Sequence, residues 1–152
     1  MRVDRSGTPG TGWVIVLDTG EELVGSLTGF AREHRILGAS IRAIGAFSSV
    51  RLAYFDWEAK EYRTSVDLNE QVELVSLIGD LAEKDGEPQL HAHAAVALAD
   101  GRVLGGHVQE AHVRPTCEII LTQTPEPLRK KVDPESGLAL IRLDASPGTT
   151  RT

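Results

Sequence analysis

The period at which apolar residues recur changes along the chain. Between residues 20 and 34 they return every three or four positions, at Leu23, Leu27, Phe30 and Ala31, with His34 closing the series. This spacing is typical of an amphipathic helix, whose apolar face packs on the rest of the protein. Thr19 and Glu22 match a capping box, which satisfies the first free N–H groups of a helix. The sequence therefore predicts a helix from about 20 to 34.

Elsewhere the apolar residues alternate with polar ones, or form short runs rich in β-branched side chains, as strands do. A loop is expected over residues 83–89. The segments predicted to be strands are 13–17, 39–46, 48–55, 62–66, 72–79, 90–108 as a hairpin, 117–122 and 138–143. Most connections are too short for the crossovers that parallel strands need. The predicted fold class is therefore α+β, a largely antiparallel sheet packed with one main amphipathic helix.

The hairpin at residues 90–108 turns at Asp100-Gly101, a dipeptide typical of such turns. A strict two-residue turn would place His107 opposite Ala94, on the wrong face. A three-residue loop would instead pair His93 with His107, and we expect this register. A bulge at the neighbouring pair of glycines would be a second way to reach it.

In the expected register, one face of the hairpin carries His91, His93 and His107, and the other face is apolar throughout. Three neutral imidazoles on one face suit a divalent metal, with zinc preferred, and leave a fourth position for water or a ligand atom. Zinc can lower the pKa of a bound water to about 7, so hydrolysis is chemically accessible. The sequence thus predicts a metal site with these three ligands.

The remaining candidate residues are less suited to chemistry. Glu73 is a candidate general base, because it is the one charge in an apolar strand, but a surface acid paired with Arg51 or Arg42 is the favoured interpretation. His112 is expected at a surface or interface, and Cys117 is expected to be buried and inert. No Ser-His-Asp spacing, phosphate-binding loop or dinucleotide fingerprint is present.

Composition narrows the class of protein. The net charge of −6 argues against a nucleic-acid binder, which usually carries a basic excess. No apolar run approaches the roughly 20 residues that span a membrane, and we find no signal-peptide pattern at the start. A single cysteine excludes an internal disulfide. We therefore expect one cytoplasmic domain over residues 12–143, with flexible tails at 1–11 and 144–152, and no membrane partner.

Together, Leu90-His91-Ala92-His93, Ala99–Val103 and Gly105-Gly106-His107 resemble the PPC domain, the plant and prokaryote conserved domain. The segment Val72–Gly79 resembles the family's strand upstream of that hairpin, and the likeness extends over about residues 12–143. It implies a compact α+β domain, a homotrimer and, in the prokaryotic branch, a metal, with zinc favoured, held by the three matching histidines. Plant members lack these histidines and carry DNA-binding AT-hooks. This chain contains no Arg-Gly-Arg-Pro core of an AT-hook.

These observations rank three functions. The first is a metal-binding, trimeric PPC protein with a role in regulation or in binding a small-molecule ligand. The second is a metal-dependent hydrolase or lyase acting on a small molecule; an enzyme is not favoured, because the sequence offers no full catalytic constellation. The third is a DNA-associated regulator without an AT-hook, which the acidic composition disfavours.

Overall fold

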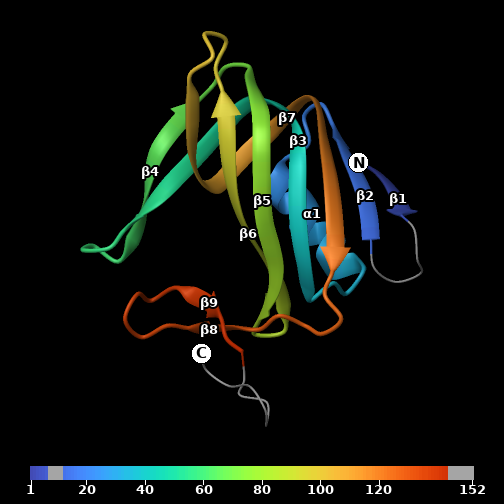
Figure 1. The fold of residues 1–152 in the computed structure, drawn as a ribbon, viewed down its shortest axis with the longest axis vertical. Coiled ribbons are helices and arrows are strands. Elements are labelled where there is room, and N and C mark those ends of the chain that lie inside the picture. Colours follow the sequence, from blue (N-terminus) through green and yellow to red (C-terminus); the bar gives the residue numbers. More distant parts are fainter. Residues whose placement is uncertain (7–11, 144–152) are drawn as a thin grey trace.

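The structure, a computed structural model, describes residues 1–6 and 12–143 (Figure 1). The residues expected to form a C-terminal tail, 144–152, lie outside this part of the chain. In chain order the elements are β1 (Arg2–Ser6), β2 (Gly12–Asp18), α1 (Leu23–Glu33), β3 (Gly38–Asp56), β4 (Glu61–Leu68), β5 (Val72–Lys84), β6 (Glu87–Ala97), β7 (Val103–Gln123), β8 (Lys130–Val132) and β9 (Ala139–Ile141).

Seven strands form one antiparallel sheet in the order β1-β2-β7-β6-β5-β3-β4. A further antiparallel pairing of β3 with β7 closes the sheet on itself. Figure 1 shows α1 lying behind β5 and β3, and the β8–β9 hairpin lying across the lower end of the sheet. The architecture confirms the predicted α+β class.

The core lies between the helix and the sheet. Leu27 and Phe30 of α1 are at most 2% exposed, and they belong to the same apolar cluster as Ile119 and Leu121 of β7. The predicted amphipathic face of the helix is therefore confirmed. Within the part of the chain that the structure describes, no helix is long and apolar enough to cross a membrane.

The start of the helix differs from the prediction. The N-cap is Glu22, whose carboxylate accepts the N–H groups of two residues of the first turn at 2.9 and 2.6 Å. Thr19, expected to cap the helix, instead donates its hydroxyl to the carbonyl oxygen of Pro115 in β7 at 3.1 Å. Because the chain turns through Gly20, with φ +89°, the helix cannot begin before that point.

The expected loop over 83–89 is wrong. Lys84 pairs with Glu87, so β5 and β6 are joined by only two residues, Asp85 and Gly86. Both have positive φ, 54° and 88°. An Asp-Gly pair with two positive φ angles makes the tight hairpin turn whose twist matches that of the strands.

The two strands expected at 39–46 and 48–55 are one 19-residue strand, β3. The pairing of β3 with β5 and β7 shifts around Gly45, which absorbs the irregularity with φ +154°. A Cβ atom at Gly45 would lie 2.3 Å from the carbonyl oxygen of Thr116. Glycine thus lets β3 bend and stay continuous against β7.

The N-terminal tail expected at 1–11 is also wrong over residues 2–6, which form β1 and pair with β2; residues 7–11 lie outside the described residues. Arg2 forms an ion pair with Asp18 at 2.8 Å, and the terminal ammonium contacts Glu21 at 2.6 Å. The unpaired edge of β2 gives this polar segment a ladder of hydrogen bonds, a tertiary effect that its composition does not reveal.

Candidate metal centre

The β6–β7 hairpin has the predicted register. His93 lies opposite His107, and the pairing continues without a break to Ala97 and Val103. The N–H of Leu98 donates to the carbonyl of Arg102 at 2.9 Å, which closes the three-residue loop 99–101. The alternative route, a bulge at the two glycines, is not used.

Gly106, next to His107, lets β7 pack closely against β3. Gly106 faces β3, and a Cβ atom there would lie 2.7 Å from the carbonyl oxygen of Ala53. Only glycine permits this close approach of two backbones. Since Ala53 pairs with His107 itself, the contact also fixes the place of that histidine in the sheet.

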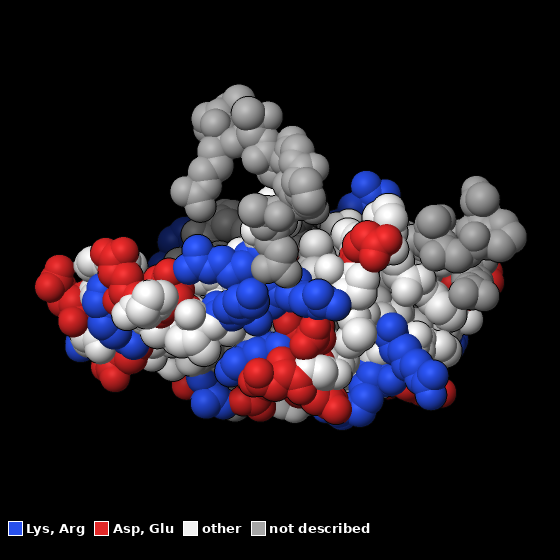
Figure 2. Space-filling view, turned by 90° about the horizontal axis from the view of Figure 1, so that it is seen from below, with Lys and Arg blue, Asp and Glu red and all other residues white. Residues whose placement is uncertain are grey.

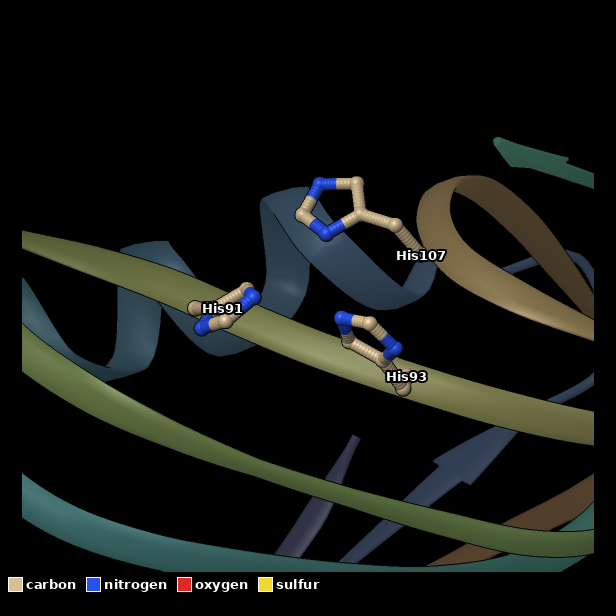
Figure 3. Close-up of side chains that lie close together, drawn as sticks. All are labelled: His91, His93 and His107. Carbon is tan, nitrogen blue, oxygen red and sulfur yellow. The ribbon is translucent and has the colours of Figure 1, made fainter. Parts of the chain in front are cut away.

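The three histidines converge on a common space (Figure 3). His91 and His93 come from β6 and His107 from β7, and their ring centroids lie 5.2 to 5.5 Å apart. One ring nitrogen of each can be chosen so that all three lie within 4.8 Å of one another. The sheet therefore brings the predicted ligands together.

The electrostatics of these rings fit a cation. Burial first, and then the charges of His91, His93 and Lys130, lowers the pKa of His107 to about 4. Partial burial followed by the charge of His91 also lowers the pKa of His93, the most exposed of the three. In the described part of the chain, the buried Nδ1 of His107 has no hydrogen-bond partner. Neutral imidazoles with a free, desolvated nitrogen are the form that binds a divalent metal.

Two further charged residues stand behind His91, and the sequence did not single them out. Asp80 lies opposite His91 on β5, with Oδ2 3.3 Å from Nδ1 of the ring. Lys130 of β8 places Nζ 3.3 Å from the other carboxylate oxygen of Asp80. The sequence offered one signal for Asp80, a charged residue directly after the apolar strand predicted to end at Gly79. Because β5 continues to Lys84, Asp80 lies inside the strand.

A cavity of about 150 Å³ adjoins the histidines. His91 and His107 form one wall, and Tyr62, which stacks on His107 with ring centroids 4.3 Å apart, continues it. The remaining lining comes from Gln89, Leu90, Lys130, Leu138, Ala139 and Leu140. The β8–β9 hairpin thus forms part of the wall.

The structure does not bring Glu73 to the histidines. It is exposed on β5 and lies opposite Ala97, near the loop end of the hairpin, whereas His91 lies opposite Asp80. Arg51, one of the partners proposed for it, pairs instead with Glu110.

His112 and Cys117 both lie on β7, which continues through the strand end expected before His112. Nδ1 of His112 lies 3.3 Å from the hydroxyl of Ser49, outside the cluster of three histidines. Cys117 is fully buried, and burial first, then the charge of Glu118, raises its pKa to about 12. An inert, protonated thiol, as expected, does not suit a metal ligand.

Most of the chain matches a known protein family. The model of the Plants and Prokaryotes Conserved (PCC) domain, also written PPC, matches residues 4–125. The chain belongs to this family. The resemblance seen in the sequence is thereby confirmed.

Solved structures of PPC-like proteins share the fold. A PPC protein from Pyrococcus horikoshii is 33% identical, with 93% of this chain and all of that chain covered and a TM-score of 0.81. A protein from Archaeoglobus fulgidus described as metal-containing is 35% identical, over 94% of this chain and 100% of that one, with a TM-score of 0.81. A candidate DNA-binding protein from Bacteroides thetaiotaomicron is 26% identical, over 90% and 94%, with a TM-score of 0.84.

One curated relative is a longer protein that is similar to this chain over part of its length. The bifunctional protein GlmU of Synechococcus sp. (strain JA-3-3Ab) is 31% identical over 128 residues. These cover 82% of this chain and 19% of that protein. The PPC chain therefore spans about a fifth of the length of this relative.

Proposed function

We propose that this PPC protein binds one divalent metal ion, zinc by preference, through His91, His93 and His107. The observation that carries the proposal is the set of three imidazole nitrogens within 4.8 Å of one another, together with the buried Nδ1 of His107, which has no hydrogen-bond partner in the described part of the chain. The description of the Archaeoglobus relative as metal-containing supports it. Nitrogen donors in a set of three are typical of zinc sites that keep one position open.

Elemental analysis of protein purified without a histidine tag tests this proposal. We expect about one metal ion per chain in the wild type, and its loss in His93→Ala. A wild-type protein that takes up no zinc, even when zinc is supplied after purification, would contradict it.

We further propose that the cavity beside the metal takes a small molecule, and that this binding serves regulation. An enclosed cavity of about 150 Å³ in another protein accommodates benzene, so the part of the ligand that lies inside this cavity is about that size. The metal, when bound, supplies a Lewis-acid position for one donor atom of that ligand. Tyr62, Gln89 and Lys130 offer polar contacts, while Leu138 and Leu140 cover its apolar part.

A second candidate function is a metal-dependent hydrolase or lyase, favoured by the cavity that His91 and His107 line. Purified protein can be screened against esters, phosphodiesters and cyclic amides, with His93→Ala as the control. Activity that requires His93 would support this function, and activity that survives removal of the metal would count against it.

We also propose a homotrimer, as the family resemblance implies. Exposed apolar side chains on the outer face of the sheet support an interface there: Ile44 is 60% exposed, Val75 51% and Ile78 65%. Ile44 and Ile78 line a groove of about 500 Å³ that also includes Val14 and Ile120, and Val75 lines a neighbouring groove that shares Ile44. Contiguous apolar surface of this kind is typical of sites covered by another chain.

Light scattering on the wild type tests the assembly, with three chains per particle expected. Ile44→Glu should shift the population toward single chains, because a buried carboxylate without a partner is costly. A wild type that runs as a single chain would overturn the trimer and leave the metal site intact.

We expect no DNA binding by this chain alone, although the Bacteroides relative is described as a candidate DNA-binding protein. Figure 2 shows basic side chains mixed with acidic ones at the β8–β9 end of the molecule. In the basic run there, Arg129 pairs with Glu83 and Lys130 with Asp80. Gel shifts at two salt concentrations test this, because phosphate contacts weaken as salt rises.

A further inference from the structure

We propose that Asp80 is a positioning residue of the metal site, and that the buried ammonium of Lys130 holds Asp80 in place. The inference rests on the proposed metal site and adds to it two residues that do not touch the metal. It also gives the β8–β9 hairpin a part in that site.

The first step is the choice of nitrogen on His91. Nδ1 of His91 lies 3.3 Å from Oδ2 of Asp80, and an ionised carboxylate can only accept a hydrogen bond. Nδ1 must therefore carry the proton, which leaves the lone pair of the neutral ring on Nε2. A nitrogen that donates to a carboxylate cannot also bind a metal, so Nε2 is the ligand atom of His91.

The second step is the state of Asp80. The carboxylate is partly buried, with 24% of the side chain exposed. Nζ of Lys130, a positive charge, lies 3.3 Å from Oδ1, and aspartate is ordinarily ionised well below neutral pH. Asp80 is thus an acceptor for His91 at neutral pH.

The third step is the role of Lys130. Its side chain is only 4% exposed, an unusual burial for a lysine, and Nζ lies 3.3 Å from Oδ1 of Asp80. The two carboxylate oxygens therefore lie beside different groups: Oδ2 faces His91, and Oδ1 is in ion-pair contact with Lys130 but forms no hydrogen bond within the described residues. The ion pair limits rotation of the carboxylate and so favours one orientation of the His91 ring.

The chain of contacts reaches past the residues that the family model matches. Lys130 and the residues 138–140 that line the cavity follow the family match, which ends at residue 125. The hairpin is tied to the end of β5, where the N–H of Glu83 donates to the carbonyl of Leu128 at 2.7 Å and Arg129 pairs with Glu83. We infer that this C-terminal hairpin is part of the metal site as well as its cover.

Zinc affinity measured by competition with a coloured chelator tests the inference. Asp80→Asn should weaken zinc binding by about tenfold to a hundredfold, the usual effect of losing the partner behind a metal-binding histidine. Asp18→Asn is the matched control, since Asp18 is also ion-paired but contacts Arg2 and the N-terminus. The double variant Asp80→Asn with Lys130→Met removes both charges, and should weaken binding as much without leaving a buried ammonium unpaired.

The outcomes separate the two proposals. Equal zinc affinity of the wild type and a folded Asp80→Asn protein would overturn the positioning role and leave the three-histidine site standing. Absence of zinc binding by the wild type would overturn the metal site and the positioning role with it.

A second measurement needs no variant and no metal. Nitrogen-15 NMR of the histidine rings in the metal-free wild type, recorded above the pH range in which imidazole titrates, reports which nitrogen carries the proton. We expect His91 as the Nδ1–H form. Finding the proton on Nε2 would overturn the inference, whatever the zinc affinities are.

Discussion

Side chains of the β6–β7 hairpin alternate between two faces, and the two faces have different roles. One face carries His91, His93 and His107, with a buried ring nitrogen that has no hydrogen-bond partner among the described residues. The other face places Val96 and Val108 in the core, at 0% and 6% exposure. Stability and candidate chemistry are therefore separated by the direction in which each side chain points.

The difference indicates that the three histidines are not there to stabilise the fold. A buried polar atom without a partner costs about 1–3 kcal/mol, and charging any of three close imidazoles disfavours charging the others. The apolar face gains free energy by burial. Substitutions on the histidine face should therefore weaken zinc binding without lowering the free energy of unfolding. Substitutions on the apolar face should lower the free energy of unfolding without weakening zinc binding.

The largest effect is expected on zinc binding at the histidine face. His107→Ala removes one of three ligands and should raise the zinc Kd by more than about a hundredfold, beyond the effect of losing an outer partner. Its metal-free form should be no less stable than the wild type, because a desolvated ring without a partner is removed. His112→Ala on the same strand is the matched control for a competition titration. An unchanged zinc affinity in His107→Ala would contradict the assignment of zinc binding to the histidine face.

On the core face, Val96→Ala should lower the free energy of unfolding by about 2 kcal/mol, the value for deleting two buried methyl-sized groups and leaving a small cavity. Urea unfolding of metal-free protein measures it. Val103→Ala, at a site 56% exposed on the same hairpin, is the control and should stay within about 0.5 kcal/mol. Loss of zinc stoichiometry in folded Val96→Ala would show that the faces are not independent.

A smaller effect is expected from pH on the metal-free protein. The pKa of His107 is about 4 in the folded chain against an ordinary value of 6.5, so between these values the unfolded state binds more protons. The free energy of unfolding should therefore fall as the pH is lowered from 6.5 toward 4, and fall less steeply in His107→Ala. Equal slopes in the two proteins would contradict the burial of this ring.

The smallest effect is expected at Glu73, away from both the histidines and the core. Glu73→Gln should change the free energy of unfolding by less than about 0.5 kcal/mol, as for other exposed positions, and should leave zinc affinity unchanged. Thermal unfolding and the same chelator competition check both. A marked loss of zinc affinity would mean that Glu73 reaches the metal site after all, for instance in an assembly of several chains.

Glu73 and Asp80, seven residues apart on β5, differ in how local pattern relates to position in the sheet. Glu73 drew attention because it interrupts an apolar run, yet the strand leaves it exposed opposite Ala97. Asp80 lies just outside the predicted strand, which ends at 79, and the sequence pattern predicts a loop over 83–89 where the chain forms the tight Asp85-Gly86 turn. The hairpin that actually forms carries β5 onward and brings Asp80 opposite His91.

The sequence by itself determined the helix that buries Leu27 and Phe30, the register that pairs His93 with His107, and membership of the PPC family, because these depend on short-range periodicity and turn chemistry. Only the tertiary structure decided that β1 pairs at the edge of the sheet, that β3 and β7 are continuous, and that Lys130 reaches Asp80 behind His91. Two of these features join residues far apart in the chain, because β3 and β7 pair from Ala39 to Gln123 and Lys130 contacts Asp80. Their energies come from close approach and burial, which no local pattern encodes.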